Sequence, residues 1–228
     1  MNTTIATAPD QAASNARIAG IVLVCASVLE VFVMAHHPVG SANNIADAAT
    51  EIASKAWIDR VVHGSLIALV GAVLLAYVEL SYHLGLQRRM VRCAIIVYAV
   101  GVCAMIGAAL IDGFIVSSLG EHYARASAAD LEGFRHLLML CELGGVQTLS
   151  NFGTLAMSSG IIFWCVALLH ISNANRWLAA LGLLLGALPA LALLSGLLHL
   201  NMHGMLAVIV CQTLWNIVLG IQLIRAKI

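Results

Sequence analysis

Charged residues are scarce in this sequence. They make up 10% of its 228 residues, whereas an ordinary soluble domain carries about 25% to face water. Hydrophobic residues make up 61%, and the mean hydropathy is +0.97. These values exclude an ordinary soluble domain and predict that the lipid bilayer is the main partner of the chain.

An excess of positive charge is also lacking, and aromatic residues are few. Eleven Lys and Arg residues balance eleven Asp and Glu residues, and Phe, Trp and Tyr together make up 6%. Nucleic-acid binding needs a basic surface and uses aromatic side chains that stack on bases. We therefore expect no nucleic acid among the partners.

Six apolar runs are long enough to cross a membrane, because a spanning helix needs about 20 apolar residues. We predict an all-α integral membrane protein, a compact bundle of six transmembrane helices. Residues 1–16 would form a disordered cytoplasmic N-terminus and residues 17–228 a single domain. An amphipathic outer segment over 131–142 precedes the fourth helix, and Gly144 and Gly145 are expected to separate the two. The predicted spans are 17–37, 57–84, 93–119, 149–171, 177–198 and 205–224.

The first apolar run has to be weighed against a cleavable signal peptide. The apolar region of a signal peptide covers about 7 to 15 residues behind a basic start. Here the run extends from Ile18 to Ala35, contains Glu30, and follows a stretch without Lys or Arg before Arg17. We therefore assign it to a helix of the mature protein.

The basic residues predict how the helices are oriented. Six spans place the two termini on the same side, and positive charge is enriched on the cytoplasmic side of membrane proteins. Seven basic residues fall on the side of the termini and four on the other; the seven are Arg17, Arg88, Arg89, Arg92, Arg176, Arg225 and Lys227. We predict a multi-pass protein of the bacterial inner membrane with both termini in the cytoplasm.

Several enzyme signatures are missing. The sequence contains no GxSxG, HExxH, glycine-rich phosphate loop or CxxCH haem attachment site. Its six cysteines are spread through the spans without a CxxC pair, so we expect them to be packing residues and not disulfides.

Histidine, in contrast, is concentrated near the outer ends of the predicted helices. Imidazole is a common ligand of Zn, Cu and Fe, and ionisable groups at membrane depth are expected to face the bundle interior. The HxxxH spacing of His199 and His203 would place both on one helix face if the helix included both. His63 is the expected third ligand. The seven outer histidines are His36, His37, His63, His122, His136, His199 and His203.

Asp112 and three further histidines are candidates to complete this metal site. His36 and His37 are adjacent and point in different directions, so at most one of them is expected to enter it. His136 is the third of these histidines, although its i, i+4 spacing from Glu132 also fits an ordinary surface pair.

Two carboxylates are candidate catalytic groups in the same region. Asp112 lies within an apolar run, so it needs either a partner or a proton. An ion pair with Arg60 and a hydrogen bond to a metal-binding histidine are both open to it. Asp112 or Glu142 could act as a general base if the metal activates a water molecule. Glu30 has His63 or Arg60 as possible partners.

Haem b is an alternative cofactor. His63 and His83 are twenty residues apart on one predicted helix, which corresponds to about 30 Å. Each could bind a haem near one face of the membrane, with His136 or His199 as the second ligand outside and His170 inside. This arrangement would transfer electrons across the membrane.

The residues His63, Asp112, His199 and His203 are similar in type and order to zinc-site residues of a known family. That family is the seven-helix metal-dependent hydrolases that include alkaline ceramidases and adiponectin receptors. The resemblance covers four residues, and this chain has six predicted helices, an HxxxH at a helix connection and a site on the inferred outer face. It assigns no family to the chain.

Two functions from different classes follow from these residues. The first is redox or metal-assisted hydrolytic chemistry on a lipid-soluble small molecule, with Zn, Cu, Fe or haem at the outer helix ends. The second is a cofactor-free small transporter or accessory membrane subunit, whose buried ionisable groups form ion pairs or a proton relay. A homo-oligomer or a larger membrane complex is compatible with both.

Overall fold

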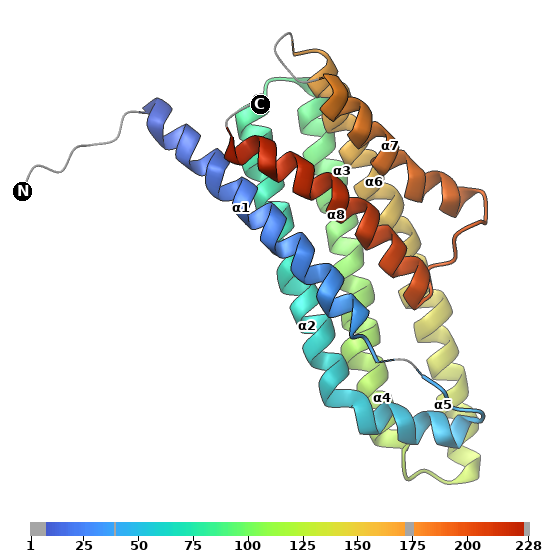
Figure 1. Ribbon diagram of the computed structural model, residues 1–228. Coiled ribbons are helices and arrows are strands. Elements are labelled where there is room, and N and C mark those ends of the chain that lie inside the picture. The colour runs from blue at the N-terminus through green and yellow to red at the C-terminus, as the bar shows by residue number, and fades with distance from the viewer. Residues whose placement is uncertain (1–7, 39, 172–175, 226–228) are drawn as a thin grey trace, which may run out of the picture.

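A computed structural model describes residues 8–38, 40–171 and 176–225 of the chain. Its regular elements in these ranges are all helical (Figure 1). Two π-helical segments, η1 (Ile111–Val116) and η2 (Leu140–Gln147), connect α3 to α4 and α5 to α6. The α-helices are α1 (Ala8–Ala35), α2 (Ile45–Leu84), α3 (Arg89–Leu110), α4 (Ser117–Tyr123), α5 (Ala128–Met139), α6 (Thr148–Leu169), α7 (Arg176–Leu194) and α8 (Met202–Ile224).

The predicted number of helices with the length and apolarity of membrane spans is confirmed within the described residues. Six helical runs there are long and apolar enough to cross a membrane. Helix α1 begins at Ala8, so it extends into the region that we predict to be disordered, whereas residues 1–7 lie outside the described part. The six runs are Ala13–Ala35, Ile45–Leu84, Arg89–Tyr123, Ala129–Leu169, Arg176–Leu194 and Met202–Ile224.

The expected separation at Gly144 and Gly145 is wrong. Helix α5 continues through η2 into α6, so the chain stays helical across both glycines. A π-helical segment accommodates an extra residue inside a helix without ending it. A β-carbon added to Gly145 would come within 2.8 Å of the Ile111 side chain on η1. Glycine therefore permits a close contact between the two π-helical segments at this point.

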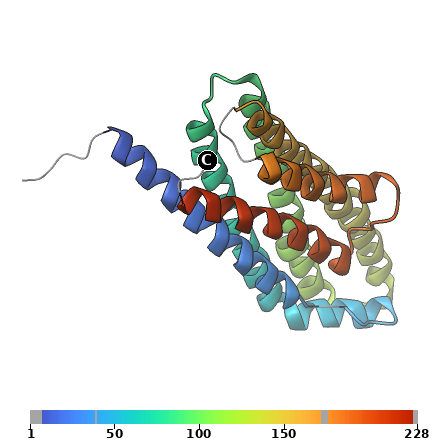
Figure 2. The same ribbon diagram turned by 45° about the horizontal axis from the view of Figure 1, so that its top comes forward.

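The six spans form a closed ring of packed helices. Each span packs against the next along the chain, and α8 returns to pack against α1. Figures 1 and 2 show α1 and α8 side by side along one side of the bundle. Gly20 of α1 meets Gly220 of α8, where a β-carbon on Gly20 would lie 2.6 Å from the Gly220 carbonyl oxygen. Small residues allow such close approach of membrane helices.

An aromatic cluster forms the core between four of the helices. Tyr77 of α2, Tyr98 of α3 and Trp164 of α6 are buried, and the Tyr77 and Trp164 rings stack with centroids 4.4 Å apart. The Trp164 Nε1 donates to Ser81 Oγ at 3.0 Å, and the Tyr77 hydroxyl donates to Asn216 Oδ1 on α8 at 2.6 Å. These contacts join α2, α3, α6 and α8.

Replacing Tyr77 with phenylalanine tests this core. The substitution leaves Asn216 Oδ1 without its hydroxyl donor, and hydrogen bonds between membrane helices contribute about 0.6 to 1.7 kcal/mol. We expect the free energy of unfolding to fall by about 1 kcal/mol, measured by reversible SDS-induced unfolding in mixed micelles. Tyr82→Phe is the control, because Tyr82 is exposed on the same helix. Equal stability of the Tyr77→Phe variant and the native protein would contradict the assignment.

Candidate metal centre

Four ionisable side chains meet at the end of the bundle where α1 leads into α2, which we call the site end. His37 lies just beyond α1, which ends at Ala35. Asp59 and His63 are one turn apart on α2, so they share one face of that helix. Asp112 belongs to η1, which packs against α2. Three separate segments of the chain therefore contribute to the group.

The distances between these side chains suit a single bound ion. One ligand atom each from His37, Asp59 and His63 lies within 4.8 Å of the other two; no other such group exists in the described part of the chain. The Nε2 atoms of His37 and His63 are 3.4 Å apart, and His37 Nε2 is 3.7 Å from Asp59 Oδ1. Two ligands of a tetrahedral zinc ion, each about 2.0 to 2.1 Å from the metal, are separated by about 3.3 Å.

Backbone carbonyls orient both imidazole rings. His37 Nδ1 lies 2.9 Å from the Pro38 carbonyl oxygen, and His63 Nδ1 lies 2.9 Å from the Asp59 carbonyl oxygen. A neutral imidazole that donates from Nδ1 carries a lone pair on Nε2. The two Nε2 lone pairs then face each other, which is favourable only with a proton or a cation between them. Metal-binding histidines are commonly held by such a hydrogen bond from the other ring nitrogen.

Asp59 contributes a carboxylate oxygen that has no hydrogen-bond donor. Its Oδ2 accepts from Ser117 Oγ at 3.1 Å, whereas Oδ1 is buried and forms no hydrogen bond among the described residues. This Oδ1 lies 3.2 Å from His63 Nδ1, an ion-pair distance without hydrogen-bond geometry. A buried carboxylate oxygen without a donor is costly. A bound cation would remove that cost.

Asp112 contacts this group of side chains at His63. Its Oδ2 lies 3.2 Å from His63 Nε2. The His63 side chain is 6% exposed, whereas that of Asp112 is 28% exposed. Asp112 is therefore the more accessible partner, next to the nitrogen with which His63 would bind a metal.

Two cavities meet at this group. The inner cavity, about 180 Å³ in volume, extends between the helices and is lined by Glu30, Tyr98 and Asn216 as well as by His37, His63 and Asp112. The loop cavity, about 660 Å³, is lined by Pro38, Gly40, Ser41 and Ala42 among others. His37 and Asp112 line both cavities. The candidate centre thus separates a mainly apolar space within the bundle from a more polar space at its end.

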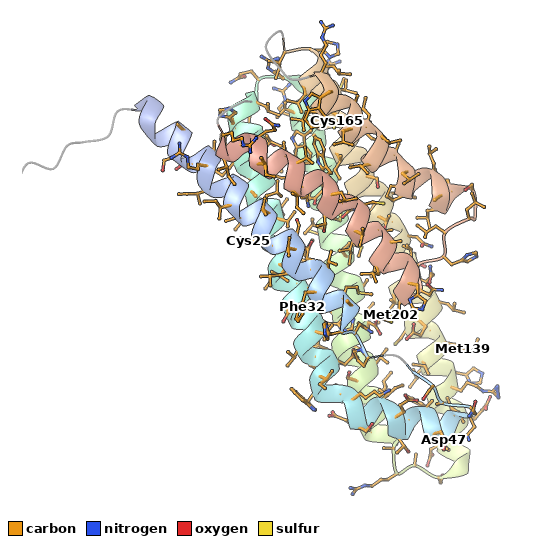
Figure 3. All side chains as sticks on the ribbon, in the orientation of Figure 1. Cys25, Phe32, Asp47, Met139, Cys165 and Met202 are labelled. Atoms are coloured by element: carbon orange, nitrogen blue, oxygen red, sulfur yellow. The ribbon has the colours of Figure 1, made fainter. Side chains whose placement is uncertain are left out.

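Figure 3 helps to locate the inner cavity along the bundle. Phe32, labelled near the end of α1, accepts a hydrogen bond at its carbonyl oxygen from the neighbouring His36. Met202, labelled at the start of α8, lines the inner cavity together with His37 and His63. The end of the cavity that contains His37 and His63 therefore lies between the end of α1 and the beginning of α8.

The structure brings together three of the residues predicted from the sequence: His37, His63 and Asp112. Sequence reasoning did not select Asp59 as a ligand. Its i, i+4 spacing from His63 on a predicted helix was the available signal. Glu142 on η2 is exposed and lines the loop cavity together with Asp59 and Asp112. Its position is compatible with the predicted role as a base.

The HxxxH pair is not brought together on one helix face. Helix α8 begins at Met202 and is capped by Asn201, whose side chain accepts from the Gly204 backbone N–H at 2.9 Å. His199 therefore precedes the helix, whereas His203 is inside it, and both are exposed. A spacing of four residues places side chains on one face only where all the residues between them are helical.

The remaining predicted histidines lie away from the candidate centre. His36 is exposed, and its Nδ1 pairs with the Phe32 carbonyl oxygen at 2.8 Å. His136 is 73% exposed on α5. His83 and His170 are exposed near the opposite end of the bundle, where His170 Nδ1 pairs with the Val166 carbonyl oxygen at 2.7 Å.

Arg60 has a different partner from the one considered for Asp112. Its guanidinium donates to the Glu121 carboxylate, with Nη1 3.0 Å from Oε1. Asp112 is paired with His63 instead. Of the two roles open to Asp112, the contact with a candidate metal-binding histidine is the one observed.

Comparison of the chain with protein-family models, with curated proteins and with solved structures gives no match. The arguments for a function therefore come from the geometry of the site.

Proposed function

We propose that this chain is a metal-dependent membrane protein that binds one transition-metal ion at the site end of the bundle. The proposed ligands are His37 Nε2, His63 Nε2 and Asp59 Oδ1. The observation that carries the proposal is that His37 Nε2 lies 3.4 Å from His63 Nε2 and 3.7 Å from Asp59 Oδ1, a buried carboxylate oxygen without a hydrogen-bond donor among the described residues. Separations of 3.4 and 3.7 Å between the proposed ligand atoms support a shared ion.

Three protein ligands leave a fourth position for water or substrate, which is the pattern of catalytic zinc sites. A metal there would lower the pKa of a bound water molecule and make it a nucleophile. Asp112, which is partly exposed beside His63, is the proposed base for that water. Glu142, on the loop cavity, is the second candidate for this role. The reaction class that fits is metal-assisted hydrolysis.

The two cavities support a lipid-soluble substrate. The inner cavity reaches from the candidate centre into the region between the membrane-spanning helices, whereas the loop cavity lies at the end of the bundle. In the proposed arrangement, an apolar substrate reaches the metal from the inner cavity and water reaches it from the loop cavity. Hydrolysis at this boundary needs both.

The ligand set bears on the identity of the metal. Two imidazoles and one carboxylate are borderline to hard ligands that suit zinc, and the same set binds iron in non-haem oxygenases, which would supply redox chemistry. On the Nε2 side of His63, His37 and Asp112 approach within 3.4 Å. A haem would need that space, so the arrangement favours a bare ion over haem b.

Elemental analysis tests the proposal directly. We expect the detergent-purified protein, freed from unbound ions by gel filtration, to contain about one Zn or Fe ion per chain. Stoichiometric zinc would support hydrolysis, stoichiometric iron would support the redox version, and a Soret band would instead indicate haem. Metal-free protein that takes up neither ion on reconstitution would refute the proposal.

Replacing Asp112 with asparagine tests how much its carboxylate contributes to metal affinity while the three proposed ligands stay in place. Asparagine keeps the shape of the side chain but removes the negative charge 3.2 Å from His63 Nε2, the proposed ligand atom. Loss of a group that lies next to a metal ligand typically costs about 10- to 100-fold in metal affinity. We expect a decrease in this range, measured by competition with a chromophoric chelator. Asp130→Asn, on the exposed surface of α5, is the control for the change in charge. Unchanged affinity would remove Asp112 from the centre.

A second candidate function needs no metal. Both nitrogens of His63 lie 3.2 Å from carboxylate oxygens, Nδ1 from Asp59 and Nε2 from Asp112. A doubly protonated His63 between them would form a buried ion-pair relay of the kind that carries protons in transporters. Two results together would favour this function over the metal-dependent one. They are absence of metal from the native protein and loss of its proton transport in proteoliposomes when His63 is replaced by Gln.

Location and assembly remain predictions. A bacterial inner membrane, cytoplasmic termini and a homo-oligomer or larger complex rest on the distribution of charge and apolar residues in the sequence. Six apolar helices of spanning length support the placement in a bilayer.

A further inference from the structure

Glu30 is a carboxylate within the membrane-spanning part of the bundle. It lies on α1, seven residues before His37, which corresponds to about 10 Å along the helix. Its side chain lines the inner cavity together with Val70 of α2, Tyr98 of α3 and Met157 of α6. Glu30 therefore faces a shared space between helices and is distinct from the candidate metal centre.

No cation of the described part of the chain balances this carboxylate. Glu30 forms no hydrogen bond or ion pair there, and neither lysine nor arginine lines the inner cavity. The partners that the sequence offers are engaged elsewhere, since Arg60 pairs with Glu121 and His63 contacts two aspartates. A carboxylate at membrane depth without a counter-ion is expensive, and such residues commonly serve as counter-ions of ligands.

The walls near Glu30 suit an organic cation. Glu30 is close enough to Tyr77 and Tyr98 to interact with both electrostatically. Tyr98 lines the cavity, and three soft, polarisable methionines, Met34, Met105 and Met157, line it as well. Aromatic rings attract ammonium groups through cation–π interactions. The other titratable groups on the cavity are His37, His63 and Asp112, which meet one another at the site end.

An inorganic cation fits this place poorly. Calcium takes about 6 to 8 oxygen ligands and magnesium about six. Besides Glu30, the lining around it is largely made of aliphatic, aromatic and thioether side chains such as Val70, Tyr98 and Met157. An ion that carries its own apolar groups needs fewer oxygen ligands.

We propose that the inner cavity binds a lipophilic organic monocation, an amine or quaternary ammonium group attached to a single apolar ring, with Glu30 as its counter-ion. The cavity volume of about 180 Å³ limits the ligand to about the size of one substituted ring, because an engineered apolar cavity of about 150 Å³ accommodates benzene. This binding site shares the inner cavity with the metal centre proposed above, but its charged partner is Glu30 and not a proposed metal ligand.

A pair of probes of the same shape tests the role of charge. Benzyltrimethylammonium and neopentylbenzene differ by one atom, a cationic nitrogen in place of a carbon. We expect the native protein in lipid nanodiscs to bind the cation at least about tenfold more tightly than the neutral compound, measured by titration calorimetry. Glu30→Gln should abolish this preference, so that the two probes bind within about threefold of each other.

Two control variants make the outcome specific. Glu79→Gln changes a glutamate of α2 that is outside the cavity lining, and the preference for the cation should persist. Asp59→Asn removes a proposed metal ligand that lines only the loop cavity, so it should lower metal content and keep the preference. Conversely, Glu30→Gln should keep the metal. These variants distinguish failure of this proposal from failure of the metal proposal.

Three results would overturn the proposal. They are equal binding of the two probes by the native protein, no binding of the cation, and an undiminished preference in a folded Glu30→Gln variant. The comparison of the two probes needs only the native protein, so the test stands even if the Glu30→Gln variant does not fold.

Discussion

Replacing His63 with alanine is expected to lower bound metal from about one ion per chain to less than about a tenth of that amount. His63 lies at the middle of the candidate centre, within 3.4 Å of His37, Asp59 and Asp112. Its loss removes one of three ligands and also the contact through which Asp112 approaches the group. The measurement is mass-spectrometric metal analysis of the purified, gel-filtered variant beside the native protein.

His36→Ala is the matched control for this prediction. His36 is the neighbour of the proposed ligand His37, but its ring is exposed and pairs with the Phe32 carbonyl oxygen. His36→Ala should therefore keep the metal, whereas His37→Ala should lose it. His203→Ala should also keep it, because His203 is exposed and outside the group of three. Equal metal content in the His36 and His37 variants would contradict the assignment of ligands.

A chelator should remove the metal from the native protein and so reproduce part of the effect of the His63→Ala substitution. A metal that binds only the folded state stabilises it by about 4 kcal/mol when its free concentration is a thousand times the Kd. Removal of the metal should therefore lower the melting temperature of the native protein and leave that of the His63→Ala variant unchanged. An equal shift in both proteins would mean that the chelator acts elsewhere.

The substitution Gly113→Ala should disrupt the centre without altering any ligand. A β-carbon at Gly113 would lie 2.7 Å from His63 Nδ1 and closer still to the Cβ and Cγ atoms of His63. These atoms lie where η1 packs against α2, so the His63 ring has to move away from Gly113 and out of its present position. We expect metal affinity to fall by at least about 100-fold and the free energy of unfolding to fall by about 1 to 3 kcal/mol.

Gly64→Ala is the corresponding control. Gly64 follows His63 on the same helix, but a β-carbon there would meet only Phe114, at an ordinary contact distance of 3.8 Å. This variant should therefore keep its metal, and its stability should be at least that of the native protein, because alanine favours a helix interior over glycine by about 1 kcal/mol. Metal affinity that is lost equally in both variants would show that the close contact at Gly113 is not the cause.

Parts of the candidate site were predictable from local sequence. His63 and Asp112 stand out because ionisable groups in apolar runs need partners, and their pairing at 3.2 Å is what the structure contains. Asp59 was within reach of the same reasoning, since its spacing from His63 places both on one helix face. The spacing could not show which other segments of the chain would approach that helix face.

Other parts depended on where helices begin and bend. The HxxxH spacing did not place both histidines on one helix face, because α8 begins between them. The two π-helical segments, which carry Asp112 and Glu142, gave no periodic signal in the sequence. A π-helical turn rotates the side chains after it relative to an α-helix, so the face on which Asp112 lies follows from packing and not from counting residues.

The amino-acid composition and the length of the apolar runs determined by themselves that the described part of this protein has six helices long and apolar enough to span a membrane, because spanning length and hydropathy are properties of each helix separately. Tertiary structure decided that His37 and not its neighbour His36 approaches Asp59 and His63, and that Glu30 has no ion-pair partner among the described residues. Each of these depends on distances between helices that only the packed bundle sets.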